Sequence, residues 1–414
     1  MSRPRPVRLI AGTAAGAVAA LALAACTSEA TPPDEPRAAD EPGPASAPER
    51  DPAAAPFEAE VRVAGGSVQQ AAVDSAVTVA AADGTLERVV AYSGRRSADT
   101  TLDGALSRDG VTWTLTDDGA LEPGVTYTVE STGTNDEGDR RTVTDRFSTD
   151  DLTLDEQTYP SVAPLEGETV GVGMPVIVTF DVPVTDRAGI ERHLSVTSSP
   201  QVRGSWHWLS DTEVHYRPRT FWPAGTEVDV DVDINSVDAG KGIYGQESRE
   251  VSFDVGDSVV SKVDLDTQRM RVEVNGRTAR TIAISGGKAG FETRGGTKLI
   301  MEKFESKRMD AATTGIQPGD PEYYNIANVE YAMRVTYSGE FLHAAPWSVG
   351  SQGSANVSHG CVGMSTENAA WLFGISHRGD VVQVNGSQRP IEYGNGWTDW
   401  DMSWAEYKAG SALT

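Results

Sequence analysis

Apolar and polar residues alternate along most of this chain. After residue 56, short apolar runs with a period of two are separated by Gly, Asp and Asn. Such alternation places successive side chains on opposite faces of a strand, and regularly spaced turn residues between strands are typical of β-sandwiches. The pattern therefore predicts two sandwich modules of roughly 100 residues each, at 57–152 and 153–255.

A weak internal repeat supports the division into two modules. The segment from "PGVTYTVEST" to "RTVTDRFSTD", residues 123–150, parallels the segment from "AGTEVDVDVD" to "REVSFDVGD", residues 224–257, in order and spacing. Each copy has a glycine turn, an alternating strand, a loop and a second strand that carries Phe147 or Phe253. We expect both phenylalanines to be buried inside their modules.

The alternation continues into a third domain, residues 256–386. In "RMRVEVNGRTARTIAIS", apolar residues at every second position lead to Asn275-Gly276. This dipeptide is a strong signal for a two-residue type I′ hairpin turn, because both of its residues tolerate positive φ. Further strand-like runs occupy 298–304 and 332–343, so we expect the whole chain to be mainly β.

One convincing helix follows Cys361. Ser365 is placed to cap its N-terminus, Glu367 suits its first turn, and Gly374 is placed to end it. The interior of this helix is filled by Ala369, Ala370 and Leu372.

The C-terminal tail, residues 387–414, is rich in tryptophan. Its segment "GNGWTDWDMSWAEYKAG" carries Trp397, Trp400 and Trp404. Tryptophans can form a platform for carbohydrate, but large aromatic side chains more often pack into a protein core. We therefore expect the tail to pack back onto the third domain.

The N-terminus has the composition of a secretory signal. The basic "MSRPRPVR" precedes "LIAGTAAGAVAALALAA", an apolar run too short and too rich in alanine to favour a permanent membrane span. The run ends in "LAAC", which resembles the bacterial lipoprotein signal, where the cysteine becomes the lipidated first residue. This resemblance implies a signal peptide at 1–25 and a lipid anchor on Cys26. The alternative is an ordinary signal peptide with a chance cysteine.

The lipid would hold the protein at the outer, extracytoplasmic face of the membrane, facing the cell wall. Residues 26–56 contain mainly Pro, Ala and acidic residues, with almost nothing apolar. Such a segment cannot bury enough surface to fold, and its prolines keep it extended. It predicts a disordered tether between the membrane and the first sandwich.

The net charge of −25 excludes some partners. Removal of residues 1–25 deletes three arginines and no acid, which would bring the charge to −28. Such a surface repels nucleic acid and offers no broad basic patch to anionic lipid. No metal-ligand spacing surrounds the histidines of the second module, which we expect to be structural or exposed: His193, His207 and His215. We therefore expect no nucleic-acid partner and no bound metal.

The chain has only two cysteines, Cys26 and Cys361. If Cys26 carries lipid, Cys361 has no partner inside the chain, and an unpaired thiol in a secreted protein requires a reason. Three readings are open: a buried small apolar residue, an intermolecular disulfide, or a nucleophile.

A nucleophilic cysteine needs a base within hydrogen-bond reach, because the thiolate is the reactive form. The third domain contains three histidines: His343, His359 and His377. His359 lies two residues before Cys361, and His343 ends an alternating run whose following loop leads back to "SHGC", residues 358–361. Gly360 would let a substrate carbonyl approach the backbone closely, leaving N–H groups free to stabilise an oxyanion.

His343 is followed by fourteen residues and then by Ser-His-Gly-Cys. This arrangement resembles the active-site signature of the L,D-transpeptidases, in their YkuD-like catalytic domain. The phrases "SGEFLHAAPWSVGSQG" and "ESKRMDAATTGI" resemble the same family outside the motif. The order of parts is also similar to the multidomain L,D-transpeptidases of actinobacteria: lipoprotein signal, tether, two immunoglobulin-like modules, catalytic domain and Trp-rich tail. The resemblance is strong over 256–385 and looser over the sandwiches.

The resemblance implies a role for each matching position. Cys361 matches the nucleophile that forms a thioester, and His343 matches the base that takes the thiol proton. His359 matches the second motif histidine, which helps to shape the site, and the N–H groups of Gly360 and Cys361 match most of the oxyanion hole. Further positions are implied to contact the substrate: Met309, Tyr324 (or its neighbour Tyr323), Ala344, Trp347, Ser358 and Gly363.

Two positions depart from the family pattern. Ala344 stands where serine occurs in relatives, but the family uses the backbone carbonyl of this residue, so alanine should suffice to orient the imidazole of His343. Gly363 stands where many relatives have Asn or Arg. The absence of a side chain at Gly363 removes a contact to the substrate or the loop, which affects the reaction rate and the fit of the substrate more than the type of reaction.

The resemblance implies peptidoglycan stem peptides as both donor and acceptor. The bond between the third-position diamino acid and the terminal D-Ala of a tetrapeptide would be cleaved, and the acyl group would pass to the side-chain amine of another stem, a 3→3 cross-link. Carbapenem acylation is implied, and no metal or organic cofactor; we also expect a monomer. Three alternatives stay open: an L,D-carboxypeptidase, an enzyme attaching proteins to the wall, and a non-catalytic wall-binding lipoprotein.

Overall fold

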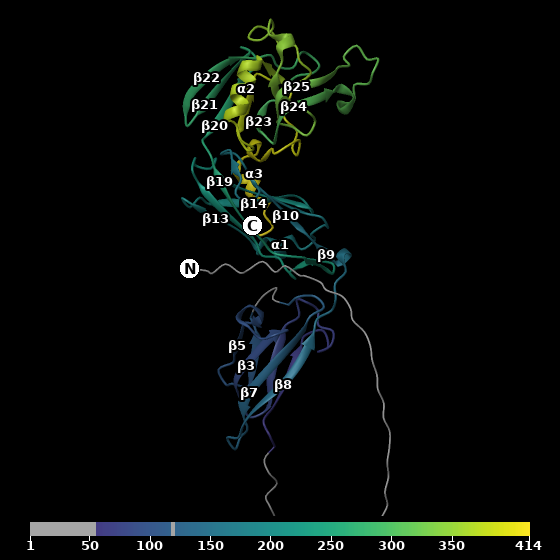
Figure 1. Ribbon diagram of the computed structural model, residues 1–414, viewed down its shortest axis with the longest axis vertical. Coiled ribbons are helices and arrows are strands. Elements are labelled where there is room, and N and C mark those ends of the chain that lie inside the picture. Colours follow the sequence, from purple (N-terminus) through teal and green to yellow (C-terminus); the bar gives the residue numbers. More distant parts are fainter. Residues whose placement is uncertain (1–54, 117–120) are drawn as a thin grey trace, which may run out of the picture. The chain divides into compact units, whose positions relative to one another are not determined.

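The computed structural model describes residues 55–116 and 121–414, and within them the chain forms two compact units. The first unit holds nearly all of strands β1–β8, and the second holds everything from Phe147 onward. Strands dominate both units (Figure 1), which confirms the expectation of a mainly β chain. The expected signal peptide, Cys26 and nearly all of the expected tether lie outside the described residues.

The first sandwich is built from two four-stranded sheets, with strand orders β1-β2-β6-β5 and β4-β3-β7-β8. Both sheets contribute buried side chains, such as Val79 and Trp113 from one and Val129 from the other. Phe147 in β8 is buried, as the repeat predicts. The strands are β1 (Glu58–Val63), β2 (Val77–Asp83), β3 (Thr85–Ser93), β4 (Thr101–Leu102), β5 (Gly104–Leu106), β6 (Thr112–Leu115), β7 (Thr126–Thr134) and β8 (Arg140–Ser148).

The second sandwich has the sheet orders β10-β12-β15-β14 and β11-β19-β16-β13, with a small third sheet, β17-β18-β9. Phe253 in β19 is buried, in agreement with the repeat. The elements are β9 (Gln157–Thr158), β10 (Pro160–Ala163), β11 (Thr169–Val170), β12 (Val176–Phe180), α1 (Arg187–Glu191), β13 (Leu194–Ser199), β14 (Gly204–Ser210), β15 (Glu213–Pro218), β16 (Glu227–Val232), β17 (Asp238–Gly240), β18 (Ile243–Gly245) and β19 (Arg249–Val255).

The third domain packs two sheets, β22-β21-β20-β28-β23 and β24-β25-β26-β27, around one core. Its strands are β20 (Val259–Asp264), β21 (Arg269–Val274), β22 (Arg277–Ala283), β23 (Gly296–Leu299), β24 (Glu302–Asp310), β25 (Asn325–Arg334), β26 (Phe341–Ala344), β27 (Val362–Met364) and β28 (Val381–Asn385). Asn275 and Gly276 have φ of 49° and 74°, which confirms the type I′ turn between β21 and β22. The runs 298–304 and 332–343 each span the end of one strand and the start of the next, so those strand boundaries were wrong.

Helix α2 (Thr366–Ile375) begins where the sequence predicts and ends slightly later. The hydroxyl of Ser365 accepts a hydrogen bond from the Asn368 N–H at 3.3 Å, which is an N-cap. Gly374 lies inside the helix rather than ending it, because Ser376 leaves the helix in extended conformation. Leu372 is fully buried in the core that both sheets share, and such burial stabilises by roughly 1.5–3 kcal/mol per large apolar side chain. Within the described ranges, no helix is long and apolar enough to span a bilayer.

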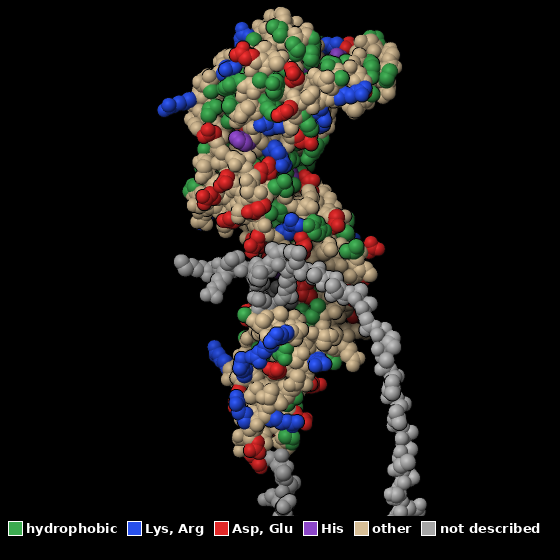
Figure 2. Space-filling model, viewed as in Figure 1, with side chains coloured by type: hydrophobic (Ala, Val, Ile, Leu, Met, Phe, Trp, Pro, Cys, Tyr) green, Lys and Arg blue, Asp and Glu red, His purple; other side chains and the backbone are tan. Residues whose placement is uncertain are grey.

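The second sandwich and the third domain share one continuous core within the second unit. Leu299 and Val381 of the third domain belong to the same buried cluster as Val172 and Met174 of the sandwich. A Cβ added at Gly173 would lie 2.5 Å from the Leu299 side chain, so only glycine allows this close approach. On the face shown in Figure 2, acidic and basic side chains are interspersed over the second unit.

The C-terminal tail contacts the third domain, as expected, and it also packs on the second sandwich, which the sequence did not predict. Trp400 donates its indole N–H to the Gly173 carbonyl at 2.6 Å. The buried guanidinium of Arg217 lies 4.4 Å from the Trp400 ring and 4.2 Å from the ring of Tyr407, in α3 (Trp404–Lys408). A buried cation of the sandwich needs such aromatic partners, and the tail supplies them. On the other side, Asp401 accepts from a backbone N–H of β23.

Candidate active site

Two neighbouring parallel strands position Cys361 and His343. His343 lies in β26 opposite Gly363 of β27, and Cys361 immediately precedes β27. The loop that joins the two strands is tied to the domain at both ends. The Ala345 N–H donates to the Met364 carbonyl at 2.8 Å, and the Ser358 N–H donates to the carbonyl of Gly286 at 3.0 Å. The fold therefore brings the "SHGC" turn back beside His343.

Cys361 and His343 line the same cavity, which has a volume of about 320 Å³. Among the described residues that line it, none is Asp, Glu, Lys or Arg. A mainly apolar cavity with a few polar groups selects ligands by shape and by a small number of hydrogen bonds. Its other lining residues are Ser285, Met309, Tyr324, Ile326, Ala345, Trp347, Ser348, Val357, Ser358, His359 and Gly363.

The imidazole of His343 has a defined orientation. Its Nδ1 lies 2.7 Å from the carbonyl oxygen of Ala344. Because a carbonyl only accepts, Nδ1 carries the proton, and Nε2 of the neutral ring is left as an acceptor. The side chain is buried under the ring of Trp347, with centroids 5.8 Å apart, and burial lowers the pKa of His343 below its usual 6.5. The imidazole is therefore neutral at pH 7.

The thiol of Cys361 is also neutral at rest. Burial raises its pKa to about 12, and the Glu340 carboxylate acts in the same direction. A backbone hydrogen bond from Phe341 and the positive charges of Lys298 and Arg334 oppose this rise. Thiol and imidazole are therefore both neutral at rest, because burial in the cavity disfavours a charge on either group.

Ser358 holds the turn that presents the cysteine. Its hydroxyl donates to the Cys361 carbonyl at 2.6 Å and accepts from the Gly360 N–H at 3.1 Å. Gly360 has a φ of 119°, a conformation that L side chains rarely adopt. The Gly360 N–H is thus already bonded, and Gly360 is not among the residues lining the cavity. This corrects the expectation that its N–H is free to bind an oxyanion.

His359 joins the motif to the segment between β24 and β25. Its Nε2 lies 2.7 Å from the Glu322 carboxylate, and its ring contacts those of Phe291 and Tyr324, with centroids 4.7 and 5.0 Å away. Tyr324 lines the cavity, whereas the hydroxyl of Tyr323 accepts a hydrogen bond from the side-chain amide of Asn325. The structure therefore places Tyr324, rather than its neighbour, on the cavity.

Comparison with known proteins identifies the family. Residues 258–384 match the L,D-transpeptidase catalytic domain, and residues 68–238 match a bacterial Ig domain. The chain is 36% identical over 343 residues to L,D-transpeptidase 2 of Mycobacterium tuberculosis (strain CDC 1551 / Oshkosh), covering 82% of this chain and 81% of that protein. The chain belongs to the L,D-transpeptidases.

Two further similarities concern other L,D-transpeptidases. L,D-transpeptidase 5 of Mycobacterium tuberculosis (strain ATCC 25618 / H37Rv) is 33% identical over 346 residues, covering 81% of this chain and 73% of the relative. A solved structure of an L,D-transpeptidase in complex with imipenem aligns with a TM-score of 0.48 and 37% identity, covering 54% of this chain and 97% of that one. This L,D-transpeptidase thus shares most of its length with curated members of the family.

The cavity of this L,D-transpeptidase gathers most of the residues singled out in the sequence. Ala344 is an exception: it is buried, does not line the cavity, and contributes its carbonyl to His343. At Gly363, an added Cβ would lie 2.8 Å from the Cβ of Ala345, so this chain has no room for a side chain beside His343. Sequence reasoning missed five lining residues, of which only Ala345 and Ser348 lie in a stretch that resembles the family: Ser285, Ile326, Ala345, Ser348 and Val357.

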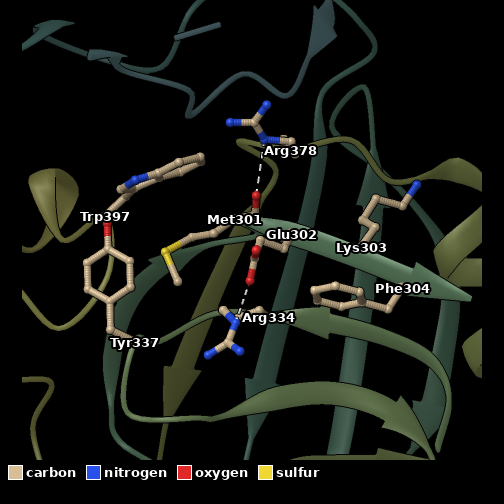
Figure 3. Close-up of a pocket in the computed structure, with 8 residues that line it drawn as sticks. All are labelled: Met301, Glu302, Lys303, Phe304, Arg334, Tyr337, Arg378 and Trp397. Atoms are coloured by element: carbon tan, nitrogen blue, oxygen red, sulfur yellow. Dashed lines mark hydrogen bonds and ion pairs between the residues drawn. The ribbon is translucent and has the colours of Figure 1, made fainter. Parts of the chain in front are cut away.

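A second cavity, of about 630 Å³, has neither cysteine nor histidine among the described residues that line it. Figure 3 shows Glu302 directed at Arg334, at 2.6 Å, and Arg378 donating to the Met301 carbonyl at 3.1 Å. Sequence reasoning missed this cavity because it joins the third domain to the tail. It is lined by Met301, Glu302, Lys303, Phe304, Arg334, Tyr337, Arg378 and Trp397.

Proposed function

We propose that this L,D-transpeptidase forms 3→3 cross-links between peptidoglycan stem peptides through a thioester on Cys361. The observation that carries the proposal is the shared cavity of Cys361 and His343, in which Nδ1 of His343 is bonded to a carbonyl and Nε2 is left as an acceptor. A thiol and an oriented base in one cavity are the minimal groups for acyl transfer through a covalent intermediate. Membership of the family supports the substrate class.

In the first half-reaction, Nε2 of His343 takes the thiol proton while Sγ of Cys361 attacks the carbonyl carbon of the third-position diamino acid. The tetrahedral intermediate collapses with cleavage of the C–N bond to D-Ala. The imidazolium returns the proton to the leaving nitrogen, so that D-Ala departs with a neutral amino group and the donor stem remains as a thioester. This order of events suits two groups that are both neutral at rest.

In the second half-reaction, the side-chain amine of another stem enters the cavity. Nε2 of His343 takes a proton from this amine as its nitrogen attacks the thioester carbonyl. A new amide bond forms, the C–S bond breaks, and the proton returns to the sulfur. With water in place of the amine, the same steps would release a tripeptide.

Tyr324 is the proposed hydrogen-bond donor to the substrate. Burial raises the pKa of Tyr324 to about 12, and a thiolate on Cys361, when it forms, and the Asp310 carboxylate act in the same direction. The phenol therefore remains protonated across the physiological range and can donate to an oxygen that gains negative charge. The N–H of Cys361 is the second proposed donor.

The test uses protein lacking residues 1–56, mixed with purified disaccharide-tetrapeptide and analysed by mass spectrometry. We expect loss of D-Ala and a new dimer. A tripeptide without a dimer would make the enzyme a carboxypeptidase under those conditions, and an intact tetrapeptide beside a Cys361 that alkylates normally would contradict the proposed substrate. As a control, Cys361→Ala should stay folded and acquire no carbapenem adduct; an adduct on this variant would contradict the proposed nucleophile.

We further propose that the enzyme acts outside the cytoplasm, anchored by a lipid on Cys26. The "LAAC" sequence supports this anchor, and the long segment before the first sandwich is suited to lift the active site toward the wall.

A further inference from the structure

A buried ion pair lies close to the candidate nucleophile and is not used in the steps above. Lys298 of β23 places Nζ 2.5 Å from Oε2 of Glu340, and the two side chains are 1% and 5% exposed. Removing two charges from water is costly, and such a pair is weak evidence for a gain in stability. Its position in the fold indicates a different use.

The second oxygen of Glu340 is also bonded. Its Oε1 accepts from Nη1 of Arg294 and from the backbone N–H of the same residue, both at 3.0 Å. Arg294 in turn pairs with Glu392 through its Nε. The carboxylate of Glu340 is therefore held from two directions, and its position is fixed more tightly than that of a surface acid.

Glu340 adjoins the backbone on both sides of the thiol, through the chain on one side and through packing on the other. It follows Gly339, whose carbonyl oxygen lies 3.7 Å from Sγ of Cys361. On the other side, a Cβ added at Gly360 would lie 3.5 Å from Oε1 of Glu340, so the carboxylate packs directly against the residue that precedes Cys361. A change at Glu340 therefore acts on the segment before β26 and on the "SHGC" turn together.

We propose that the Lys298–Glu340 pair is a positioning device for the nucleophile: Glu340 fixes the backbone on both sides of the Cys361 thiol, and Lys298 offsets the negative charge of Glu340 when the thiolate forms. The inference rests on the proposed role of Cys361 as the nucleophile.

The charges around Cys361 support this assignment. Glu340 raises the pKa of the thiol, whereas Lys298 and Arg334 lower it. Three other titratable groups face the cavity, and none of them is an unpaired charge. The imidazole of His343 is neutral, His359 is paired with Glu322, and the phenol of Tyr324 is protonated. Loss of Lys298 would leave the thiolate facing a carboxylate with less compensation, and loss of the Glu340 charge would do the opposite.

The experiment compares Lys298→Met, Glu340→Gln and the double variant in protein lacking residues 1–56. The rate constant for alkylation of Cys361 by iodoacetamide is measured from pH 7 to 10 without any stem peptide. The pKa of the thiol lies above this range, so the alkylation rate is proportional to the small fraction of thiolate. A shift of one unit in the pKa of Cys361 therefore changes the rate tenfold. Cys361 is the only cysteine that remains when residues 1–56 are removed, so the modified residue is unambiguous.

We expect Lys298→Met to slow alkylation roughly tenfold and Glu340→Gln to speed it several-fold, with the double variant within about threefold of the wild type. Lys262→Met, which breaks a Lys–Glu pair between β20 and β21, is the matched control and should leave the rate unchanged. A purely structural role predicts that both single variants move the rate in the same direction, and that result, or no change in either, would overturn the proposal. If Lys298→Met does not fold, Glu340→Gln and the double variant still decide the sign.

The result is independent of the test of function. Opposite shifts in the two single variants would support the positioning device even if the wild type failed to cross-link tetrapeptides, because alkylation requires no substrate. A change of the alkylation rate in the same direction in both single variants would contradict the positioning role, and it would leave the proposed cross-linking reaction unaffected.

Discussion

Replacing His215 by glutamine together with Asp399 by asparagine should remove a pH-dependent part of the stability of the second unit. Nδ1 of His215 lies 2.9 Å from Asp399 of the tail, and Nε2 lies 2.8 Å from Glu213 of the sandwich. The side chains of His215 and Asp399 are 0% and 1% exposed. Both ring nitrogens face carboxylates, which only accept, so both carry a proton and the ring is charged.

The magnitude follows from the pKa of His215. Burial by itself would lower this pKa, but the two carboxylates outweigh burial and raise it from 6.5 to about 9. This difference corresponds to roughly 3 kcal/mol of folding free energy. Because the folded protein binds the proton more tightly than the unfolded chain, the stabilisation is complete below pH 6.5. It is lost as the pH rises through about 9.

Urea denaturation at several pH values between 6 and 9.5, followed by tryptophan fluorescence, measures this loss. Most of the nine tryptophans lie in the second sandwich or the tail: Trp206, Trp208, Trp222, Trp397, Trp400 and Trp404. The quantity to compare is the difference in unfolding free energy between the wild type and the double variant. Other groups that titrate in this range cancel in the difference, such as Asp380, whose pKa burial raises to about 8.

We expect this difference to fall by about 3 kcal/mol between pH 6 and pH 9.5. The second substitution matters because His215→Gln alone would leave a buried carboxylate without its main partner. His207→Gln is the matched control: His207 also bonds to the tail, but its partners are the Tyr407 carbonyl and the Tyr393 hydroxyl. Because these partners are uncharged, this control removes a histidine contact with the tail without removing a pairing with carboxylates. A difference that stays constant between pH 6 and 9.5 would refute the charged pair.

Four further substitutions test the site and the anchor. His343→Ala removes the proposed base and should slow carbapenem acylation of Cys361 roughly 100-fold or more, with an unchanged melting temperature; an unchanged acylation rate would contradict the role. Gly360→Ala forces a side chain onto a φ of 119° and should cost roughly 1–3 kcal/mol in urea denaturation, and no loss would mean that the turn relaxes freely. Gly363→Asn should lower both the melting temperature and the acylation rate, because its Cβ meets that of Ala345 at 2.8 Å; faster acylation would contradict this steric account. Cys26→Ala in the full chain should abolish labelling by a fatty-acid analogue in cells, and persistent label would exclude the anchor.

The sequence by itself determined the features that depend on neighbouring residues. The type I′ turn at Asn275-Gly276 and the cap at Ser365 follow from the backbone preferences of a few residues, and the burial of Phe147 follows from a period of two. The spacing from His343 to Cys361 was enough to indicate the family, because a single loop joins β26, which holds His343, to the turn before β27 that holds Cys361.

Only the tertiary structure decided the features that depend on contacts between distant segments. The hydrogen bond of the Gly360 N–H, the choice of Tyr324 over its neighbour and the Lys298–Glu340 pair arise where separate strands and loops meet. The tail packs on the second sandwich because His215 and the residues around it require partners about 184 positions away. No local pattern records such a partner, since burial of a charge becomes visible only when the segments that bury it are brought together.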